Sequence, residues 1–448
     1  MCKKKLVALL ATGIFFINSA TYAANAEDFP TVDAPFADSQ QAETAEEDFP
    51  TVDEPFPKNH SSTINHTEER GKEKNSQPAE KTSKKNSQPA EKPAEVFEEP
   101  PQTEVEKPAA KTETPPPTAQ EGDGLEFLFY NENGVQAFAV VAAHEQYNLR
   151  PVIAKDHIQG RTTVSQMAGN LNDIATINAS YFSADGSLIG ITKIDGVIVS
   201  SDYFNRSAIG VNSDGTTIFG RIQYHGTVTY NGATVDINGV NCVRGTNSII
   251  VYNEFFGNAT GTNNFGVEII EHDGIITDIR RDRGNNIIPH EGHVISAHGT
   301  AAEIFANAQI GDEITFEENI LSEDADFNSA PYVLGAGPRL VRDGEVFVTA
   351  TEEDFPPDIR MGRAPRSAVG VTKYGDYFFA VVDGRQAHSR GCTLEEWAKI
   401  LVDKFGAFQA INLDGGGSTV LVVKDKLVNS PSDGRERAVG SALTILPK

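Results

Sequence analysis

Cysteine is scarce in this sequence: only Cys242 and Cys392 follow the apolar run near the N-terminus, and Cys2 precedes that run. Two cysteines permit one disulfide in an oxidising compartment, and two unpaired thiols fit the sequence equally well. The cysteines therefore give no argument for a fold built on disulfides. Cysteine and histidine also nowhere form a cluster with the spacing of a zinc site.

Basic residues are in a clear minority. The chain has 38 Lys and Arg against 63 Asp and Glu, which makes the formal net charge −25. Because nucleic acid phosphates are bound by basic faces, we expect no nucleic acid partner. A small anionic substrate remains compatible with this composition, since a few local arginines are enough to bind it. No protein partner is indicated by the sequence.

Long apolar runs are missing after the N-terminus. Three lysines precede an apolar run from Leu6 to Ile17, and small residues follow it through Ala26. This order is typical of a secretory signal peptide, and the run is too short to span a bilayer comfortably. We expect residues 1–26 to be a signal peptide, no transmembrane segment, and export to the periplasm, the envelope or the medium.

Composition divides the rest of the chain in two. Residues 27–123 are rich in Pro, Glu and Lys and have too few apolar side chains to offset chain entropy, which predicts a disordered spacer. In residues 124–448 short β-branched and aromatic runs alternate with Gly, Asn and Asp turns, which predicts a mostly β domain. Residues 205–320 are expected to be either a β-rich subdomain or further strands of one sheet system, ending with a helix at Ala301–Ala308.

One helix is well marked near the C-terminus. Thr393 is its expected N-cap, Glu396 completes a capping box three residues later, and Gly406 ends it. It lies between the predicted strands Tyr377–Val382 and Phe408–Leu413, which indicates a parallel pairing of these two strands. The predicted fold class is α+β: a β-rich mixed sheet with this strand-helix-strand unit near the C-terminus, preceded by a disordered spacer.

The predicted strand Phe408–Leu413 stops on an acid and three consecutive glycines. Glycine lets the backbone adopt dihedrals closed to other residues and approach a ligand closely. A tight turn into the next predicted strand, Thr419–Val423, is the simpler interpretation, but three glycines are more than a hairpin needs. We therefore expect a functional site here. Its residues are Asp414, Gly415, Gly416, Gly417 and Ser418.

Polar residues follow other predicted strands as well. Asp383 comes directly after a strand, and in a parallel sheet it would share with Asp414 the edge at which ligands bind. His388 is a candidate proton carrier or an ordinary loop histidine. Arg363 and Arg366 flank a proline and suit a carboxylate or phosphate, unless they are solvated surface residues. Further candidates at strand ends or in the C-terminal connection are Asn178, Asn412, Glu436 and Arg437.

Six motifs occur along residues 125–448 in an order that resembles the phosphodiester glycosidase family. They are Asn178-Ala-Ser-Tyr-Phe182, Gly335-Ala-Gly-Pro-Arg-Leu340, Arg363-Ala-Pro-Arg-Ser-Ala-Val-Gly370, Val382-Asp-Gly-Arg385, Asn412-Leu-Asp-Gly-Gly-Gly-Ser-Thr419 and Glu436-Arg437. The family commonly has Asn-Gly-Gly or Asn-Gly-Ser in the first motif. The Ala179-Ser180 pair of this chain departs from that pattern, and its larger side chains are expected to narrow the pocket.

The resemblance implies hydrolysis of an α-linked, GlcNAc-like sugar-1-phosphodiester between sugar C1 and the phosphate oxygen. The departing phosphate is already a stabilised anion, so less general-acid help is needed than at an ordinary glycoside. The reaction still needs a carboxylate that activates water or stabilises the oxocarbenium-like centre. Asp414 is the expected base or nucleophile, with Asp383 and Glu436 as competitors for that role.

The phosphate needs a charged partner in this interpretation. Arg366 is the expected phosphate ligand, with Arg363 and Arg437 as helpers. Backbone amides of the glycine run are expected to approach the phosphate oxygens. The residues expected to bind substrate or to position the acids are Asn178, Asn412, Gly415, Gly416, Gly417, Ser418 and His388.

Two other functions remain open. A metal-dependent phosphodiesterase that breaks a P–O bond would use Asp383, Asp414 and His388 as ligands and would lose activity on chelation. A non-catalytic, envelope polysaccharide-binding module would hold a sugar phosphate without turnover. The main interpretation needs no cofactor and no catalytic metal, and it leaves room for a structural divalent cation. Its expected partner is a small sugar-phosphodiester or a phosphate-linked glycan.

Overall fold

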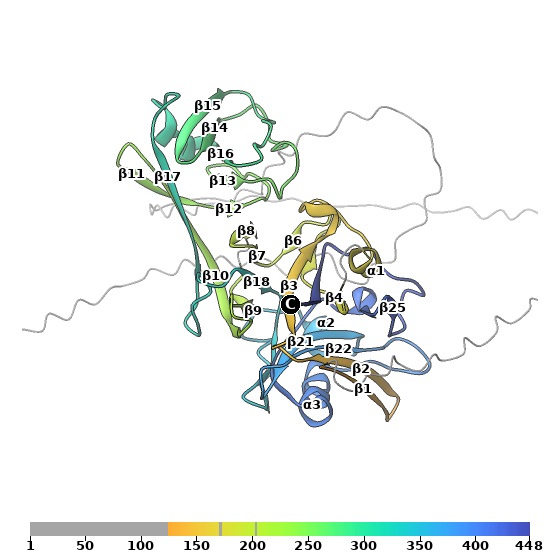
Figure 1. Cartoon of the computed structure of the whole chain (residues 1–448). Coiled ribbons are helices and arrows are strands. Elements are labelled where there is room, and N and C mark those ends of the chain that lie inside the picture. Colours follow the sequence, from red (N-terminus) through yellow and green to blue (C-terminus); the bar gives the residue numbers. More distant parts are fainter. Residues whose placement is uncertain (1–123, 170–172, 202–203) are drawn as a thin grey trace, which may run out of the picture. The chain divides into compact units, whose positions relative to one another are not determined.

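The computed structural model describes residues 124–448, apart from 170–172 and 202–203. The predictions of a signal peptide at 1–26 and of a disordered spacer at 27–123 lie outside the described residues. The described part is β-rich, as predicted, and contains few helices (Figure 1). No helix in this part combines the length and the apolar character needed to cross a membrane.

A seven-stranded sheet contains most of the strands predicted near the C-terminus. Every neighbouring pair in it is antiparallel. Across the sheet, its strands are β1 (Leu125–Glu132), β2 (Val135–Ala142), β22 (Tyr377–Val382), β21 (Arg366–Thr372), β23 (Ala407–Asn412), β19 (Arg339–Arg342) and β20 (Glu345–Val346). The prediction of a mixed sheet with parallel neighbours is therefore wrong for this sheet.

β22 and β23 run parallel to each other but do not pair. β21 lies between them and is antiparallel to both. The reason is local: a short turn after Thr372 joins β21 and β22 into a hairpin, and β23 then pairs with the free edge of β21. Because β22 and β23 still point the same way, Asp383 and Asp414 emerge at the same edge of the sheet.

The helix between β22 and β23 is α3 (Leu394–Phe405), and its ends match the prediction. Thr393 and Glu396 form a reciprocal capping box, and Gly406 ends the helix in the left-handed region with φ 67°. Trp397 and Leu401 are fully buried against the seven-stranded sheet. Burial of this apolar face stabilises the helix on the sheet at about 25 cal/mol per Å² of apolar surface removed from water.

A five-stranded antiparallel sheet packs on the opposite face. Its strands, in order, are β25 (Lys426–Leu427), β24 (Leu421–Val423), β4 (Ala175–Asn178), β26 (Ser441–Pro447) and β3 (Tyr147–Ile153). Val140 and Phe379 of the first sheet share one buried cluster with Ile177 and Leu443 of the second. The alternation of these side chains along their strands places the core between the two sheets.

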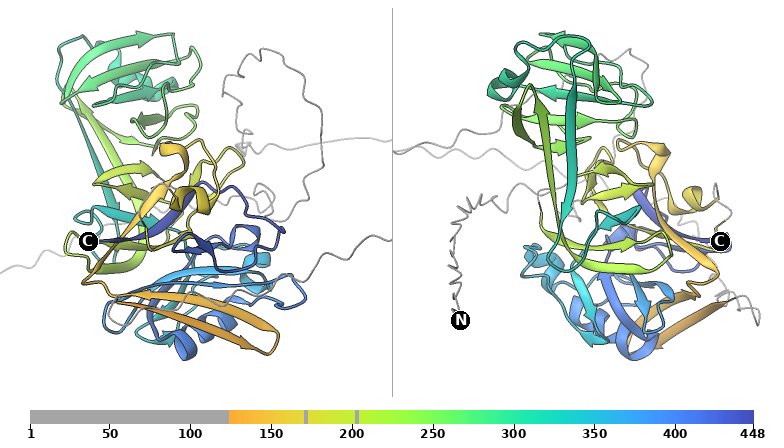
Figure 2. Two further views of the ribbon diagram at one scale, coloured as in Figure 1. Left: turned by 45° about the vertical axis from the view of Figure 1, so that its right-hand side comes forward. Right: turned by 60° about the vertical axis from the view of Figure 1, so that its left-hand side comes forward.

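A second seven-stranded sheet includes two long strands that lead away from this sandwich (Figure 2). The long strands are β10 (Thr217–Tyr230) and β17 (Ile314–Leu321), which pair with each other. The other strands are β11 (Ala233–Ile237), β9 (Arg206–Val211), β18 (Tyr332–Gly335), β7 (Thr192–Ile194) and β8 (Val197–Ser200).

The outer ends of β10 and β17 contact another five-stranded sheet, which has its own buried cluster around Ile249, Ile269 and Phe305. This cluster shows that these strands bury apolar side chains of their own, and a β-rich subdomain at residues 205–320 stays a prediction. The predicted helix Ala301–Ala308 is instead a 3₁₀ helix, η2 (Gly299–Phe305). The strands of this sheet are β12 (Gly239–Val240), β13 (Ile249–Tyr252), β16 (His293–Ala297), β14 (Val267–His272) and β15 (Ile275–Arg281).

Short elements complete the described residues, in which Cys242 and Cys392 are not joined by a disulfide. These elements are η1 (Ala154–Asp156), α1 (Val164–Ala168), β5 (Tyr181–Phe182), β6 (Leu188–Ile189), α2 (Pro357–Met361) and η3 (Gly416–Ser418).

Candidate active site

Two acids and one arginine lie at one edge of the seven-stranded sheet. Asp383 and Asp414 follow the ends of β22 and β23. β21 runs the other way and begins at this edge with Arg366, which lies opposite Val382 in the register. Since β21 separates the two acid-bearing strands, their axes are two strand spacings apart, roughly 10 Å.

The chain does not turn back into a hairpin after Asp414. β23 belongs to the seven-stranded sheet and β24 to the five-stranded sheet, so residues 413–420 cross from one sheet to the other. Gly416 has φ 60°, and a Cβ atom added at Gly417 would collide with the side chains of Arg437 and Asp433. The hairpin interpretation is therefore excluded. Glycine is favoured at position 416 by the positive φ and at position 415 by close approach, because a Cβ atom at Gly415 would lie 2.8 Å from the carbonyl oxygen of Pro365.

Two of the three glycine amides already serve the fold. The Gly415 N–H donates to Oδ1 of Asp414 at 2.9 Å, and the Gly416 N–H donates to the carbonyl of Pro365 at 2.9 Å. We expected all three glycine amides to approach a phosphate, but those of Gly415 and Gly416 already donate within the protein.

Asp414 is only 5% exposed. Burial raises the pKa of its carboxyl group to about 6, while Ser418, Arg437 and the Gly415 N–H act in the lowering direction. A carboxyl group whose pKa lies near neutral pH is suited to proton transfer in both directions. The environment of Asp414 is therefore that of a general acid or base.

Asn178 fixes the backbone that bears this acid. Its Nδ2 donates to the carbonyl of Asp414 at 2.6 Å, and its Oδ1 accepts from Oγ of Ser367 at 2.7 Å and from the N–H of Val420 at 3.1 Å. The side chain is fully buried at the end of β4. Both ends of the amide are engaged within the protein, which fits a residue that positions the acid.

Asn412 plays a similar part from the end of β23. Its Nδ2 donates to the carbonyl of Leu413 at 2.5 Å and to the hydroxyl of Tyr181 at 3.1 Å. The Tyr181 hydroxyl in turn donates to the carbonyl of Gly337 at 3.1 Å. Burial and the charge of Asp414 raise the pKa of Tyr181 well above its usual range, so its phenol stays neutral.

A cavity of about 260 Å³ lies beside Asp414. Five of the predicted site residues line it, namely Arg363, Arg366, Asp414, Gly415 and Gly416. Tyr181, Asp358 and Arg385 line it too, although they were not predicted as site residues. The cavity thus combines one buried acid with three guanidinium groups, an arrangement suited to a small anionic substrate.

The two arginines of the predicted pair have different surroundings. Arg366 is 3% exposed and donates from Nε to the carbonyl of Cys392 and from Nη2 to those of Ile359 and Gly362, at 2.7 to 3.2 Å. Among the described residues its Nη1 has no hydrogen-bond partner, which leaves two N–H groups for a ligand. Arg363 instead forms an exposed, bidentate ion pair with Glu396 of α3.

Arg385 lies against the glycine run. A Cβ atom added at Gly416 would come within 3.3 Å of Nη1 of Arg385. Its own backbone is in the left-handed region with φ 59°, a conformation that costs free energy in a residue other than glycine and often marks functional sites. Arg385 and Tyr181 both occur in the quoted motifs, a signal that could have identified them as site residues.

Asp383 and His388 form a separate contact. Nε2 of His388 lies 3.1 Å from Oδ2 of Asp383, and Oδ1 of Asp383 accepts from the N–H of Ser430 at 2.9 Å and from Asn429 at 3.2 Å. Burial raises the pKa of Asp383, and these bonds oppose the rise. Neither Asp383 nor His388 lines the cavity beside Asp414.

Glu436 and Arg437 also lie outside the lining of this cavity. Glu436 accepts from the N–H and the Oγ of Ser165, at 3.0 and 2.5 Å, at the start of α1. Arg437 forms an ion pair with Asp433, with Nη2 2.9 Å from Oδ2. Both residues therefore have partners within the protein, and their expected roles at the substrate stay predictions.

The acids and histidines do not gather into a metal centre. In the described part of the chain, no group of three or more His, Cys, Asp or Glu residues is arranged to hold a metal ion. The trio of the metal-dependent alternative is divided, because His388 contacts Asp383 and Asp414 lines a cavity that neither of them reaches.

Comparison with known proteins shows which family part of this chain resembles. Residues 265–446 match the family model of the phosphodiester glycosidases. The human N-acetylglucosamine-1-phosphodiester α-N-acetylglucosaminidase is 31% identical over 161 residues, which cover 33% of this chain and 30% of that protein. The SPbeta prophage-derived uncharacterized protein YomE of Bacillus subtilis is 41% identical over 81 residues, 18% of this chain and 12% of that protein. The chain thus spans less than a third of the length of either relative.

The similarity to one solved structure covers a larger share of this chain. The crystal structure of a hypothetical protein from Synechocystis has a TM-score of 0.63 and 25% sequence identity, and the match covers 72% of this chain and 62% of that chain. The family match contains five of the six motifs, from Gly335 to Arg437. The resemblance of this chain to the phosphodiester glycosidase family is thereby confirmed, with residues 265–446 matching that family directly.

Proposed function

We propose that the protein is a hydrolase that cleaves the glycosyl C1–O bond of an α-linked, GlcNAc-like sugar-1-phosphodiester. The observation that carries this proposal is the cavity in which a buried carboxyl group with a pKa of about 6 shares a lining with Arg366 and Arg385. The arginines supply the charge that a phosphate requires, and the acid supplies the group that acts at the sugar.

Asp414 acts in this proposal as the base that activates water or as the nucleophile. As base, Asp414 takes a proton from the water whose oxygen bonds to C1; as nucleophile, its own oxygen bonds to C1 and water later replaces it. In both cases the bond from C1 to the phosphate oxygen breaks, and its electron pair leaves with the phosphate monoester. Nη1 of Arg366 and the guanidinium of Arg385 neutralise the departing oxygens. No protonated carboxylic acid is needed on the leaving group, because a phosphate anion is stable at neutral pH.

Asp383 has a positioning role in the proposal. Its carboxylate binds His388, and its carbonyl accepts from Oγ of Ser389 at 2.6 Å. These bonds close the loop from 383 to 389, which bears Arg385. Asp383 thereby supports the phosphate side of the site without contact to the sugar.

The remaining predictions about the whole chain belong to the same proposal. Residues 1–26 would direct export, 27–123 would act as a spacer, and 124–448 would form the hydrolase domain. The sequence pattern at the N-terminus supports export to the periplasm, the envelope or the medium.

Hydrolysis of an α-GlcNAc-1-phosphodiester in heavy-oxygen water tests the proposal. Cleavage at C1 puts the label into the sugar and leaves the phosphate monoester unlabelled. Mass spectrometry of the phosphate monoester is the decisive measurement, since the anomeric hydroxyl of the sugar exchanges with water by ring opening. Label in the phosphate would establish P–O cleavage and overturn the proposal, and binding without turnover would favour the polysaccharide-binding module.

The pH dependence should follow the ionisation of Asp414. Burial raises its pKa to about 6, and only the ionised form can act as base or nucleophile. Log kcat/KM should therefore rise by about one per pH unit below pH 6 and level off above it. The profile is measured between pH 3 and 8; an inflection at the ordinary carboxyl value of 3.8, or none, would contradict this assignment.

Replacing Arg385 with Gln should weaken phosphate recognition. Loss of a charge-assisted hydrogen bond corresponds to a fall in kcat/KM of about 10- to 150-fold. Arg363→Gln is the matched control, since Arg363 lines the same cavity but is held in an exposed ion pair with Glu396, and a change below about threefold is expected. An aryl α-GlcNAc without phosphate should be hydrolysed equally by wild type and Arg385→Gln. Equal losses in both variants would refute the distinction between the two arginines.

A further inference from the structure

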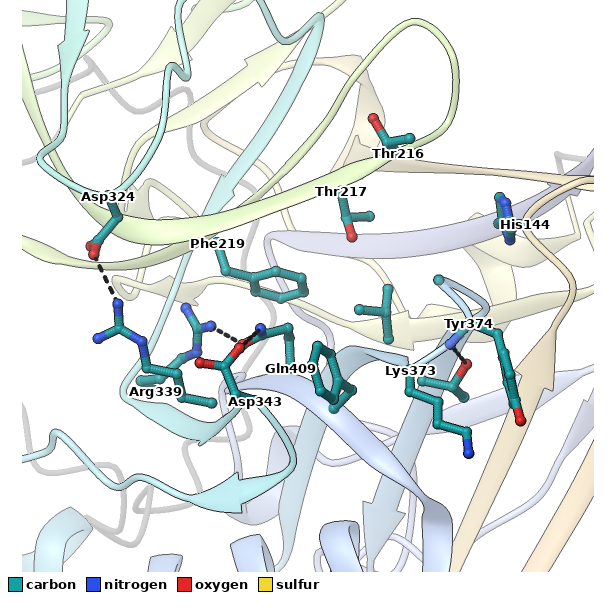
Figure 3. A pocket seen from close by; sticks show the side chains of 15 residues that line it. His144, Thr216, Thr217, Phe219, Asp324, Arg339, Asp343, Lys373, Tyr374 and Gln409 are labelled. Atoms are coloured by element: carbon teal, nitrogen blue, oxygen red, sulfur yellow. Dashed lines mark hydrogen bonds and ion pairs between the residues drawn. The ribbon is translucent and has the colours of Figure 1, made fainter.

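A second, larger cavity lies at the other end of the same strands. Its volume is about 490 Å³, and we call it the β10 cavity, after the strand that provides Thr217 and Phe219. Arg339 of β19 and Gln409 of β23 lie across from them (Figure 3). Asp414 follows the last residue of β23, whereas Gln409 lies near its start. β21 runs between the two regions for seven residues, roughly 20 Å.

A buried cation forms part of the wall of the β10 cavity. Arg339 is only 8% exposed, and its guanidinium carbon lies 4.9 Å from the ring centre of Phe219. Its Nε donates to the carbonyl of Val341 at 2.9 Å, and its Nη2 donates to Oε1 of Gln409. In the described part of the chain no ion pair joins Arg339 to a carboxylate. Burial lowers the pKa of Arg339 to about 10, so it stays charged at neutral pH.

The two carboxylates that line the cavity have partners other than Arg339, and these partners line the cavity too. Oδ1 of Asp343 accepts from Nε2 of Gln409 at 2.9 Å, and Oδ1 of Asp324 lies 3.5 Å from Nη2 of Arg342. Asp324, Asp343 and Glu353 stabilise the charge of Arg339 without forming an ion pair with it. Because a buried charge is costly without a direct partner, an external anion would add the partner that Arg339 lacks. Arg342, which is paired with Asp324, and Lys373 also line the cavity, so its lining carries three cations against two carboxylates.

Aromatic rings accompany these cations. Phe408 and Tyr374 line the cavity and are 36% and 70% exposed. Exposed rings beside amide and hydroxyl groups offer flat apolar surfaces together with hydrogen-bond partners, which is the combination that small-ligand sites use. The apolar C–H face of a sugar ring fits such a surface, and the hydroxyls of the sugar fit Thr217 and Gln409.

We propose that the β10 cavity binds an acidic carbohydrate, with the carboxylate, sulfate or phosphate of the sugar on Arg339, Arg342 and Lys373 and a sugar face on Phe408 or Tyr374. This site goes beyond the proposed hydrolysis and does not depend on it. Its distance from Asp414 means that the bound sugar is not the one cleaved. The β10 cavity therefore binds a glycan chain without cleaving it.

Calorimetric titration of the full chain with hexagalacturonate tests this inference, with the uncharged methyl ester of the same hexasaccharide as the matched ligand. The acid form should bind at least about tenfold more tightly than the ester. An Arg342→Gln/Lys373→Gln double variant and a Phe408→Ala variant should each weaken binding of the acid form by about tenfold or more. These residues are partly exposed, and thermal unfolding verifies that each variant is folded.

Two controls separate the sites. A Lys399→Gln/Lys426→Gln double variant removes the same number of charges from other surfaces and should leave affinity within twofold. Asp414→Asn should also leave it within twofold, whether or not the protein hydrolyses phosphodiesters. The inference is overturned if the acid form does not bind, if the ester binds equally well, if the cavity variants retain full affinity, or if Asp414→Asn abolishes binding.

Discussion

Replacing Asp414 with Asn is expected to lower kcat/KM for an α-GlcNAc-1-phosphodiester by at least about a thousandfold. The variant keeps the size and the buried position of the side chain but cannot accept a proton or attack C1. Substrate binding should persist, since the arginines of the cavity are unchanged. Steady-state kinetics and calorimetric binding with the same substrate measure the two effects separately.

The same substitution should make the protein more stable at neutral pH. The pKa of Asp414 is raised from 3.8 to about 6 on folding, so between these values the folded chain binds more protons than the unfolded chain, and stability falls as the pH rises. Above pH 6 the loss of unfolding free energy that ionised Asp414 causes is constant, on the order of 3 kcal/mol for a pKa shift of this size. Asn carries no charge, so the Asp414→Asn variant does not suffer this loss of stability. Its Tm should be higher than that of wild type at pH 8 and close to that of wild type near pH 4.

Asp403→Asn is the control for both effects. Asp403 forms an exposed ion pair with Lys399 on α3, at 2.8 Å, so its loss should change stability by less than about 1 kcal/mol and activity not at all. An Asp414→Asn variant that keeps a tenth of wild-type activity, or that is less stable than wild type at pH 8, would contradict the role given to this acid.

Asn178→Ala is expected to cost about 3 to 5 kcal/mol of unfolding free energy. The substitution leaves three buried groups without a partner: the carbonyl of Asp414, the hydroxyl of Ser367 and the N–H of Val420. Each unsatisfied buried group costs about 1 to 3 kcal/mol, with partial relaxation. Chemical denaturation measures the loss. Because the backbone of Asp414 is released as well, kcat should fall more than tenfold under conditions in which the variant is folded.

Asn212→Ala serves as its comparison. Asn212 donates to Oγ1 of Thr216 at 3.0 Å in an exposed turn, so its replacement should change stability by no more than about 0.5 kcal/mol. If Asn178→Ala unfolds within 1 kcal/mol of wild type, or if its folded form retains wild-type kcat, the positioning role of Asn178 is incorrect.

The parts of the fold that local chemistry determines could be predicted from the sequence. The ends of α3 depend on hydrogen bonds among Thr393, Glu396 and Gly406, which lie within one element. The acid at the end of β23 is equally local, because an apolar strand followed by glycines is visible in a short window. These features needed no knowledge of distant contacts.

Long-range partners could not be predicted in this way. Which strand lies between β22 and β23 depends on the hairpin of β21 and β22 and on the remaining free edge, and the pattern of either strand alone does not encode that choice. The partner of Glu436 in the structure is Ser165, 271 positions away, and the spacing of residues along the sequence does not reveal such a contact. Arg385 was overlooked because its importance comes from the fold of its loop, not from its spacing to other residues.

The crossing of residues 413–420 between two sheets has a consequence for folding. Asn178 and Asp414 are 236 positions apart, and their hydrogen bond requires that the seven-stranded and five-stranded sheets are already packed together. Contacts between such distant residues carry the largest loop-closure cost and form slowly. Helix α3, which is stabilised locally, should therefore reappear early in refolding, whereas catalytic competence should return only with the final docking of the two halves of the sandwich.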